Sequence, residues 1–241
     1  MSSVLNIIRT VIFYLSLAVW TVTYPILMLL IIWLIPFRFR HRILVNTWSK
    51  VAVVLCRLIC GVRWKVYGEE NIPAEACVII SNHQSTWETF FLQTLISPQT
   101  QVLKKELLSI PFFGWALRTT KPIAIDRKDP RGAMQRVRKQ GKESLARKIS
   151  VLIFPEGTRN PSGQLGNFSR GGASLASTSE VDILPIAHNA GDHWPNKTWI
   201  KKPGVIEVHI GKLIKTEGKG PAKLTNEARE WIATTLASKK N

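Results

Sequence analysis

Cysteine is scarce in this 241-residue chain, and the sequence has neither an internal repeat nor a low-complexity linker. Its three cysteines, Cys56, Cys60 and Cys77, are odd in number and form no CxxC motif. This pattern argues against a disulfide framework, favours a reducing compartment and shows no metal-binding cluster. The length fits one sizeable domain plus an appendage, and it is too short for two full domains of typical size.

Acidic residues are also few. Lys and Arg number 33 against 16 Asp and Glu, which gives a formal charge of +17. Such an excess predicts an anionic partner: nucleic acid, acidic lipid or a phosphorylated small molecule. Charge alone leaves these three classes open.

Charge is absent from residues 10–37, a run of 28 residues. As one helix the run would extend roughly 40 Å at ~1.5 Å per residue, more than a hydrocarbon core. It is longer than a signal-peptide core of ~7–15 residues and no clear A-x-A cleavage site follows, so we expect it to be retained. Three arginines follow the run, Arg38, Arg40 and Arg42, whereas only Arg9 closely precedes it. Positive charges flanking a membrane span favour the cytoplasmic side, so a single span would leave the remaining chain in the cytoplasm. Pro25 permits a kinked helix or a re-entrant hairpin instead.

The next segment, "HRILVNTWSKVAVVLCRLICGV", has the period of a helix with one narrow polar side. Its polar residues fall within an arc of about 100°: Arg42, Asn46, Ser49, Lys50 and Arg57. A buried core helix is one interpretation, but the preceding apolar run favours an interfacial membrane helix. We therefore expect residues 1–60 to form a membrane-embedded two-helix module and residues 61–241 to form the main domain.

Beyond residue 61, short β-branched runs alternate with longer helix-prone stretches, which predicts an α/β domain. The fold class expected is a mixed, mostly parallel sheet flanked by helices. Helices are expected to begin near Trp87, Arg131, Arg170 and Lys223. The predicted strands are "VRWKVYG", "ACVIIS", "TQVLKKE", "KPIAIDR", "SVLIFPEG", "VDILPIAHN" and "VIEVHIGKLI".

The stretch "SNHQSTWETF" follows one of these strands and has two interpretations. Ser85 and Glu88 fit a capping box at a helix start, in which Glu88 bonds back to the backbone. Alternatively, His83 in the loop could pair with Glu88 in the first helical turn, since two residues five apart within one helix would point to different sides. Glu88 would then orient the imidazole while its other nitrogen takes a proton from a substrate hydroxyl.

The stretch "VLIFPEGTRN" also ends a predicted strand. Pro155 stiffens the turn, and Gly157 is free to adopt positive φ. Glu156, Thr158 and Arg159 add a carboxylate, a hydroxyl and a guanidinium, a composition suited to gripping phosphate and hydroxyl groups, although a solvated turn is the plain alternative. Two other basic places follow strands, Lys104–Lys105 and Arg127.

Four stretches in this order resemble the four blocks of the glycerolipid acyltransferases, and most closely the bacterial 1-acyl-sn-glycerol-3-phosphate acyltransferases. They are "NHQSTWE", "KPIAIDR", "FPEGTRN" and "ILPIA", with "KKELLSIPFFGW" between the first two. The resemblance covers roughly residues 65–190. It implies the glycerolipid acyltransferase fold.

The resemblance also implies roles for individual residues. His83 matches the family's catalytic histidine, and Glu88 matches its acidic partner, which is more often Asp. The resemblance places the acceptor's glycerol phosphate at the third stretch, "FPEGTRN". Pro185, in the fourth stretch, would shape the pocket. The substrate-binding residues expected are Lys105, Arg127, Glu156, Gly157, Thr158 and Arg159.

The reaction implied is acyl transfer from an acyl thioester to the 2-hydroxyl of lysophosphatidate, which gives phosphatidate without a covalent acyl-enzyme. The acyl donor expected is the thioester of acyl carrier protein or of coenzyme A, which acts as a co-substrate. No cofactor or metal is expected. Backbone N–H groups at the helix start after His83 are plausible donors to the oxyanion. We expect the protein at the cytoplasmic (inner) membrane, with its main domain on the cytoplasmic side against anionic headgroups. Another lysophospholipid or a lyso-aminolipid remains an alternative acceptor.

Three other functions are less well supported by the residues. "GGASLAS" places Ser174 in a near miss to the G-x-S-x-G motif of serine hydrolases, but the last glycine is missing. His188, Asp192 and His193 lack a recognised metal-ligand spacing. A membrane-anchored basic protein that binds nucleic acid would fit the charge, but no recognition motif supports it, and we expect no nucleic-acid partner.

Overall fold

The structure is a computed structural model that describes residues 2–126 and 128–238. Its described part contains one seven-stranded sheet of order β1-β7-β6-β2-β5-β3-β4. Neighbouring strands are parallel except β6 and β7, so β1 and β7 run opposite to the other five. The strands are β1 (Val62–Tyr67), β2 (Val78–Ser81), β3 (Gln99–Lys104), β4 (Ile123–Ile125), β5 (Ser150–Ile153), β6 (Ile183–His188) and β7 (Gly204–Ile210). The predicted mixed, mostly parallel sheet is confirmed.

Side-chain alternation along the central strands builds a core on each face of the sheet. Ile79, Leu152 and Leu184 pack in one hydrophobic cluster. Their strand neighbours, among them Ile80 and Val151, pack in another cluster on the opposite face. A sheet covered on both faces needs nearly continuous apolar strands, which explains why β2 and β5 read as unbroken apolar runs.

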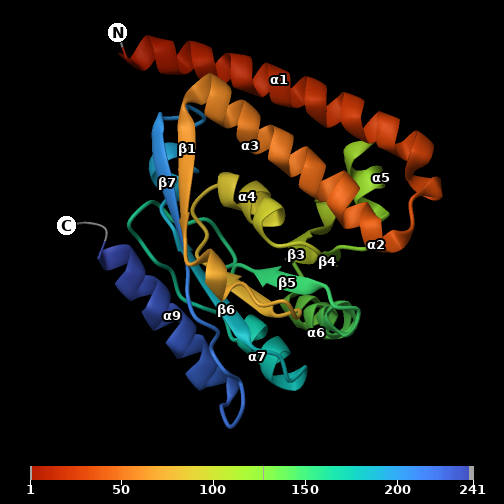
Figure 1. Cartoon of the computed structure of the whole chain (residues 1–241), viewed down its shortest axis with the longest axis vertical. Helices are drawn as coiled ribbons and strands as arrows, with labels where there is room; N and C mark the ends of the chain where they lie inside the picture. The colour runs from red at the N-terminus through yellow and green to blue at the C-terminus, as the bar shows by residue number, and fades with distance from the viewer. Residues whose placement is uncertain (1, 127, 239–241) are drawn as a thin grey trace.

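Helices cover both faces of the sheet (Figure 1). One layer contains α1 (Ser2–Ile31), α3 (Thr47–Cys60), α4 (Trp87–Leu95) and α5 (Phe113–Arg118). The other contains α6 (Pro130–Ala146), α7 (Gly171–Thr178) and α9 (Pro221–Ala237). Helices predicted near Trp87, Arg131, Arg170 and Lys223 begin within two residues of those positions. The short α5 and α8 (Ala190–His193) were not predicted, because four to six residues carry no clear helical period.

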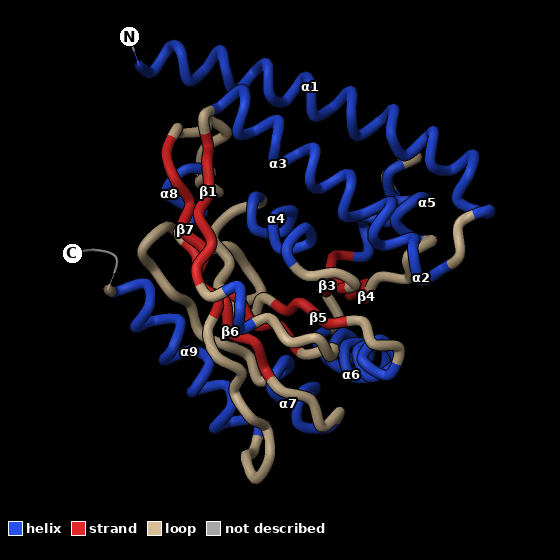
Figure 2. Tube along the Cα trace, viewed as in Figure 1, coloured by secondary structure: helices blue, strands red, loops and turns tan. Residues whose placement is uncertain are grey.

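The N-terminal segment forms two long apolar helices that lie along each other (Figure 2). Pro25 lies inside a continuous α1, and a 3-10 turn at Ile32–Leu34 ends that helix. The chain then passes through α2 (Phe37–Arg40) and a π-helical stretch, His41–Asn46, into α3. By length and composition, residues 3–34 and 37–60 could each cross a membrane.

Both N-terminal helices also pack against the sheet. Phe13 of α1, and Val53 and Cys56 of α3, belong to the same hydrophobic cluster as Ile79 and Leu152 of the sheet. The outward side of α1 and its 3-10 turn carries large exposed apolar side chains: Val4, Leu5, Ile8, Val11, Ile12, Leu15, Val19, Val22, Leu27, Leu30, Ile31, Trp33 and Leu34. An exposed apolar surface of this extent is a membrane-contacting surface, so the two helices associate the protein with a membrane.

Candidate active site

The two distinctive loops predicted from sequence meet at one edge of the sheet. The loop after β2 carries His83, and the loop after β5 carries residues 155–160. Parallel strands end at the same edge, so β2, β5 and β6 bring their following loops together. Three segments distant in sequence therefore share one site.

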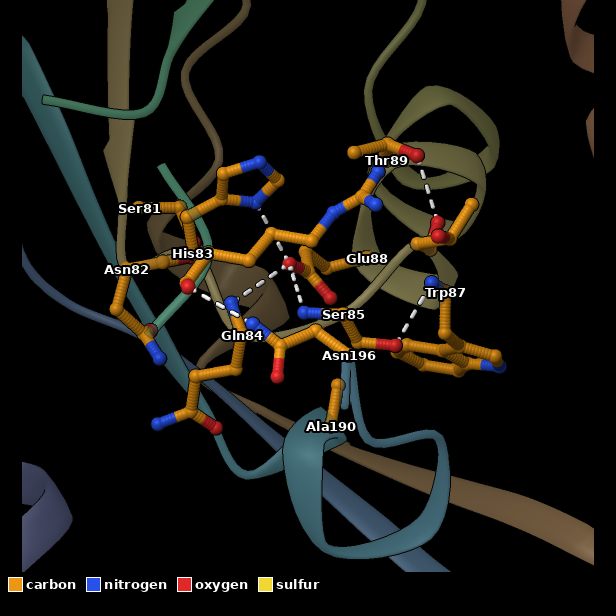
Figure 3. A network of polar contacts seen from close by, with 12 residues as sticks. Ser81, Asn82, His83, Gln84, Ser85, Trp87, Glu88, Thr89, Ala190 and Asn196 are labelled. Carbon is orange, nitrogen blue, oxygen red and sulfur yellow. Dashed lines mark hydrogen bonds and ion pairs between the residues drawn. The ribbon is translucent and has the colours of Figure 1, made fainter. Parts of the chain in front are cut away.

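His83 and Glu88 are in contact (Figure 3). His83 lies in the loop and Glu88 in the first turn of α4, the arrangement that a pair five residues apart requires. The Nδ1 atom of His83 donates to Oε1 of Glu88 at 2.9 Å. An ionised carboxylate only accepts hydrogen bonds, so Nδ1 carries the proton and Nε2 of the neutral ring carries a lone pair. Among the described residues, Nε2 has no hydrogen-bond partner.

Glu88 also caps its own helix. Its Oε1 accepts from the backbone N–H groups of Gln84 at 2.9 Å and Ser85 at 2.7 Å. Ser85 Oγ accepts from the N–H of Trp87 at 3.0 Å, although the helix N-cap position is Thr86, one residue later than predicted. The capping and pairing interpretations are therefore both satisfied by one carboxylate oxygen (Figure 3). These N–H groups of Gln84, Ser85 and Trp87 are engaged within the protein, which weakens the prediction that the helix start supplies the oxyanion donors.

The environment of Glu88 favours its charged form. The side chain is fully buried, and its Oε2 has no hydrogen-bond partner in the described part of the chain. Burial opposes ionisation, but the hydrogen bonds from His83 and from the Ser85 backbone hold the pKa of Glu88 below its usual range. The site thus keeps a buried carboxylate ready to face an imidazolium.

The loop after β5 fixes the backbone and ring of His83. The His83 N–H donates to Oε1 of Glu156 at 2.7 Å, and the His83 carbonyl accepts from the N–H of Asn160 at 2.8 Å. The Phe154 ring stacks on the imidazole with centroids 4.3 Å apart and planes 18° apart. The catalytic candidate is consequently held at its N–H, its carbonyl and one ring face.

Glu156 is committed to protein contacts on both oxygens. Its Oε2 accepts from the side chain of Asn160 and from the N–H of Gly166, the latter at 2.7 Å. Burial raises the pKa of Glu156, and the hydrogen bonds from His83, Gly166 and Asn160 oppose that rise. Sequence reasoning missed Asn160 and Gly166, since no local pattern signals a contact across the loop.

Asn82 and His188 hold β2 and β6 together behind the His83–Glu88 pair. The Asn82 side chain donates to the His188 carbonyl at 2.9 Å and accepts from the His188 N–H at 3.0 Å. His188 Nε2 bonds the Asn82 carbonyl at 2.9 Å, and Nδ1 accepts from the N–H of Ala190. One donating and one accepting nitrogen describe a neutral ring, and burial lowers the pKa of His188 accordingly. His188 is therefore a structural residue behind the site.

Three of the predicted phosphate-binding residues follow one another in the loop after β5. Gly157, Thr158 and Arg159 are exposed, and Gly157 has φ +68° with open space where a Cβ would lie. Lys105 pairs with Asp126 at 2.5 Å, and that hydrogen bond raises the pKa of Lys105. Arg127 lies outside the described residues.

The residues behind the alternative functions lie elsewhere or are otherwise engaged. Ser174 is in α7 on the other face of the sheet, where its hydroxyl accepts from Arg138 at 3.1 Å. Asp192 accepts from Ser162 and Asn189, and His193 bonds the carbonyl of Lys202 at 3.3 Å. No group of three metal-ligating side chains occurs among residues 2–126 and 128–238.

An apolar cavity of about 360 Å³ lies between the N-terminal helices, α4, β3 and α5. Thr89 and Phe90, which follow Glu88 directly in α4, contribute to its wall. Tyr24, Trp48 and Phe113 close other sides. The cavity is within the usual size range of small-molecule pockets and begins within one helical turn of the His83–Glu88 pair.

Comparisons with known proteins identify the family of this chain. The profile of the family named Acyltransferase matches residues 63–189. The 1-acyl-sn-glycerol-3-phosphate acyltransferase of Pseudomonas aeruginosa is 50% identical over 238 residues, 98% of this chain and 93% of that protein. A chloroplastic 1-acyl-sn-glycerol-3-phosphate acyltransferase of Arabidopsis thaliana is 31% identical over 83% of this chain, which spans 56% of that longer protein.

The crystal structure of the 1-acyl-sn-glycerophosphate acyltransferase from Thermotoga maritima has the same fold. It superimposes with a TM-score of 0.84 over 100% of this chain and 98% of its own, at 23% identity. The chain therefore belongs to the acyltransferase family, as one of its 1-acyl-sn-glycerol-3-phosphate acyltransferases.

Proposed function

We propose that the protein transfers an acyl group from an acyl thioester to the 2-hydroxyl of 1-acyl-sn-glycerol-3-phosphate and so forms phosphatidate. The observation that carries the mechanism is the contact between His83 Nδ1 and Glu88, which leaves Nε2 as a base. Membership of the family supports the substrates and the product.

The reaction needs one base and no covalent intermediate on the protein. His83 Nε2 takes the proton of the 2-hydroxyl as its oxygen attacks the thioester carbonyl. Glu88 stabilises the imidazolium that results and keeps the ring oriented. When the tetrahedral intermediate collapses, the C–S bond breaks and the thiolate receives the proton from His83. The products are an ester at the 2-position and a free thiol on the carrier.

The acceptor's phosphate is proposed to bind the loop after β5. Arg159 presents a planar guanidinium that can bind phosphate through two hydrogen bonds, and Thr158 and the Gly157 N–H add donors. Lys105 and Arg127 are proposed as further cations. The contacts of Glu156 support a positioning role, because both its oxygens hold the backbone and side chains around His83.

The apolar cavity is proposed to take the acyl chain of the thioester. It is lined mostly by apolar and aromatic side chains, and its wall includes Thr89 and Phe90, which directly follow Glu88 in α4. The cavity wall includes Ala116, which is almost fully buried. Enlarging this residue to Phe should shift the preferred donor to shorter chains, as a donor panel would show.

The two N-terminal helices are proposed to embed residues 1–60 in the cytoplasmic (inner) membrane. Since one side of α1 packs on the main domain, only its outward side can meet lipid. Arg38, Arg40 and Arg42 support placing the domain, residues 61–241, on the cytoplasmic side. The excess of positive charge would attract anionic headgroups. It would also attract an acidic acyl donor, which is the thioester of acyl carrier protein or of coenzyme A.

A panel of lysolipid acceptors, assayed with both carriers, tests the proposal. We expect lysophosphatidate to be preferred over lysophospholipids with larger headgroups and over lyso-aminolipids. Arg159→Ala should raise KM for lysophosphatidate more than KM for the thioester. Equal use of acceptors without a terminal phosphate, or an unchanged acceptor KM in Arg159→Ala, would contradict the phosphate assignment.

A further inference from the structure

Lys201 is a charged residue in an unusual place. Its side chain is 1% exposed, and no carboxylate among the described residues lies within ion-pair distance of it. Nζ donates to the Tyr14 hydroxyl at 2.7 Å and to the Trp199 carbonyl at 2.5 Å. It also lies over the rings of Tyr14 and Trp194, 4.6 and 4.5 Å from their centroids. Burial lowers the pKa of Lys201 to about 8. A buried cation is costly, so the packing around Lys201 must compensate.

Much of that packing comes from α1. The Lys201 N–H donates to Thr10 Oγ1 at 3.0 Å, and Phe13 meets Trp194 edge-on with centroids 5.2 Å apart. Thr10 and Phe13 are fully buried, whereas Val11, Ile12 and Leu15 are exposed. The contact therefore fixes which side of α1 faces lipid.

The same segment reaches the candidate phosphate site at its other end. We name residues 194–202, between α8 and β7, the strap. Asn196 Nδ2 donates to the carbonyl of Arg159 at 2.8 Å, and Asn196 lies beside the His83 loop in Figure 3. The N–H of the same peptide group, that of Asn160, donates to His83. The peptide between Arg159 and Asn160 is thus held on one side by the catalytic loop and on the other by the strap.

We infer that Asn196 is a positioning residue for Arg159 and that the strap couples the seating of α1 to acceptor binding. The acceptor's acyl chain lies in lipid and its phosphate at the headgroup level. A fixed link from α1 to Arg159 sets the height of the guanidinium above the lipid surface. This inference rests on the proposed function, since it assigns the acceptor phosphate to Arg159.

Steady-state kinetics of the full-length protein in vesicles containing anionic lipid test the first part. Asn196→Ala should raise KM for lysophosphatidate about 2- to 13-fold, the effect of one neutral hydrogen bond, and leave kcat and the thioester KM unchanged. Lys197→Gln is the matched control, because Lys197 is the next residue, is exposed and has no hydrogen bond in the described structure. It should leave the acceptor KM unchanged.

A double-mutant cycle tests the coupling. Lys201→Met removes the ammonium group and keeps the apolar stem, and it should also raise the acceptor KM. If the strap transmits the contact, adding Asn196→Ala to Lys201→Met should raise KM no further than the larger single effect. If Lys201→Met fails to fold, Thr10→Val removes the oxygen that accepts from the Lys201 N–H and serves in the same cycle. Additive effects would overturn the coupling.

The outcomes separate the inference from the function on which it rests. An unchanged acceptor KM in Asn196→Ala, together with a raised KM in Arg159→Ala, would overturn the role of Asn196 and leave the proposed function intact. An unchanged KM in both variants would instead refute the assignment of the phosphate to Arg159. A fall in kcat without a change in KM would show that Asn196 supports His83 rather than Arg159.

Discussion

Replacing Glu88 by glutamine separates its two structural tasks. The amide oxygen can still accept from the N–H groups of Gln84 and Ser85, so the loop keeps its shape. The substitution removes the negative charge opposite His83, whose Nδ1 lies 2.9 Å from the carboxylate. It therefore tests orientation by a charge against simple capping.

The expected loss can be worked out from that contact. The amide oxygen can also accept from His83 Nδ1, so only the charge of this hydrogen bond is lost. A hydrogen bond to a charged group contributes about 1.5–3 kcal/mol against about 0.5–1.5 kcal/mol for a neutral one, so kcat should fall by roughly 5- to 13-fold. The new NH₂ group would also lie where Oε2 is buried without a partner in the described structure. An unpaired buried donor costs about 1–3 kcal/mol, so the Tm should fall as well.

The assay is phosphatidate formation at saturating lysophosphatidate and thioester, with Tm measured on the same preparations. Ser85→Ala is the matched control: it removes the acceptor for the Trp87 N–H but leaves the Glu88 charge in place. We expect Ser85→Ala to lower Tm and leave kcat nearly unchanged. If Glu88→Gln lowers Tm alone and keeps wild-type kcat, the carboxylate is only a helix cap and the reasoning fails.

Three further predictions follow from the geometry. Gly157→Ala forces a Cβ into a backbone with φ +68° at a cost of about 1–2 kcal/mol, and should lower Tm by about 2–8 °C in thermal unfolding; an unchanged Tm would show that the turn relaxes freely. Ser174→Ala should leave kcat unchanged and the protein unlabelled by a serine-directed phosphonate, because this hydroxyl bonds Arg138 on the far face of the sheet; loss of turnover would restore the serine-hydrolase alternative. The pKa of Lys201 is lowered by burial from 10.5 to about 8, so between these pH values the unfolded chain binds more protons and stability rises with pH. The Tm difference between wild type and Lys201→Met should therefore shift in favour of wild type from pH 8 to 10. A Tm difference independent of pH would contradict this prediction.

The sheet and the contact between His83 and Glu88 were predictable because their signals are local. Runs such as "VIIS" and "SVLI" need only their own β-branched composition to indicate buried strands. The spacing of His83 and Glu88 likewise predicts a loop residue facing a first-turn residue, and the structure confirms their contact. The remaining doubt, whether Glu88 caps or pairs, could not be resolved locally because one oxygen accepts from both kinds of donor.

Other features depend on packing between distant segments. Lys201 and Lys202 are adjacent and chemically identical, yet one is buried under α1 and the other is exposed. Glu156 looked like a substrate ligand in sequence, but the fold brings Gly166 and the His83 N–H to its two oxygens. Only the tertiary arrangement decides which polar groups remain open to a substrate.

The most direct test of the account is the turnover of His83→Ala with lysophosphatidate and an acyl thioester. General-base catalysis contributes about 10²–10⁴-fold, so we expect kcat of the folded variant, measured well below its Tm, to fall by that factor. Wild-type turnover in His83→Ala would contradict the central claim that this histidine activates the acceptor hydroxyl.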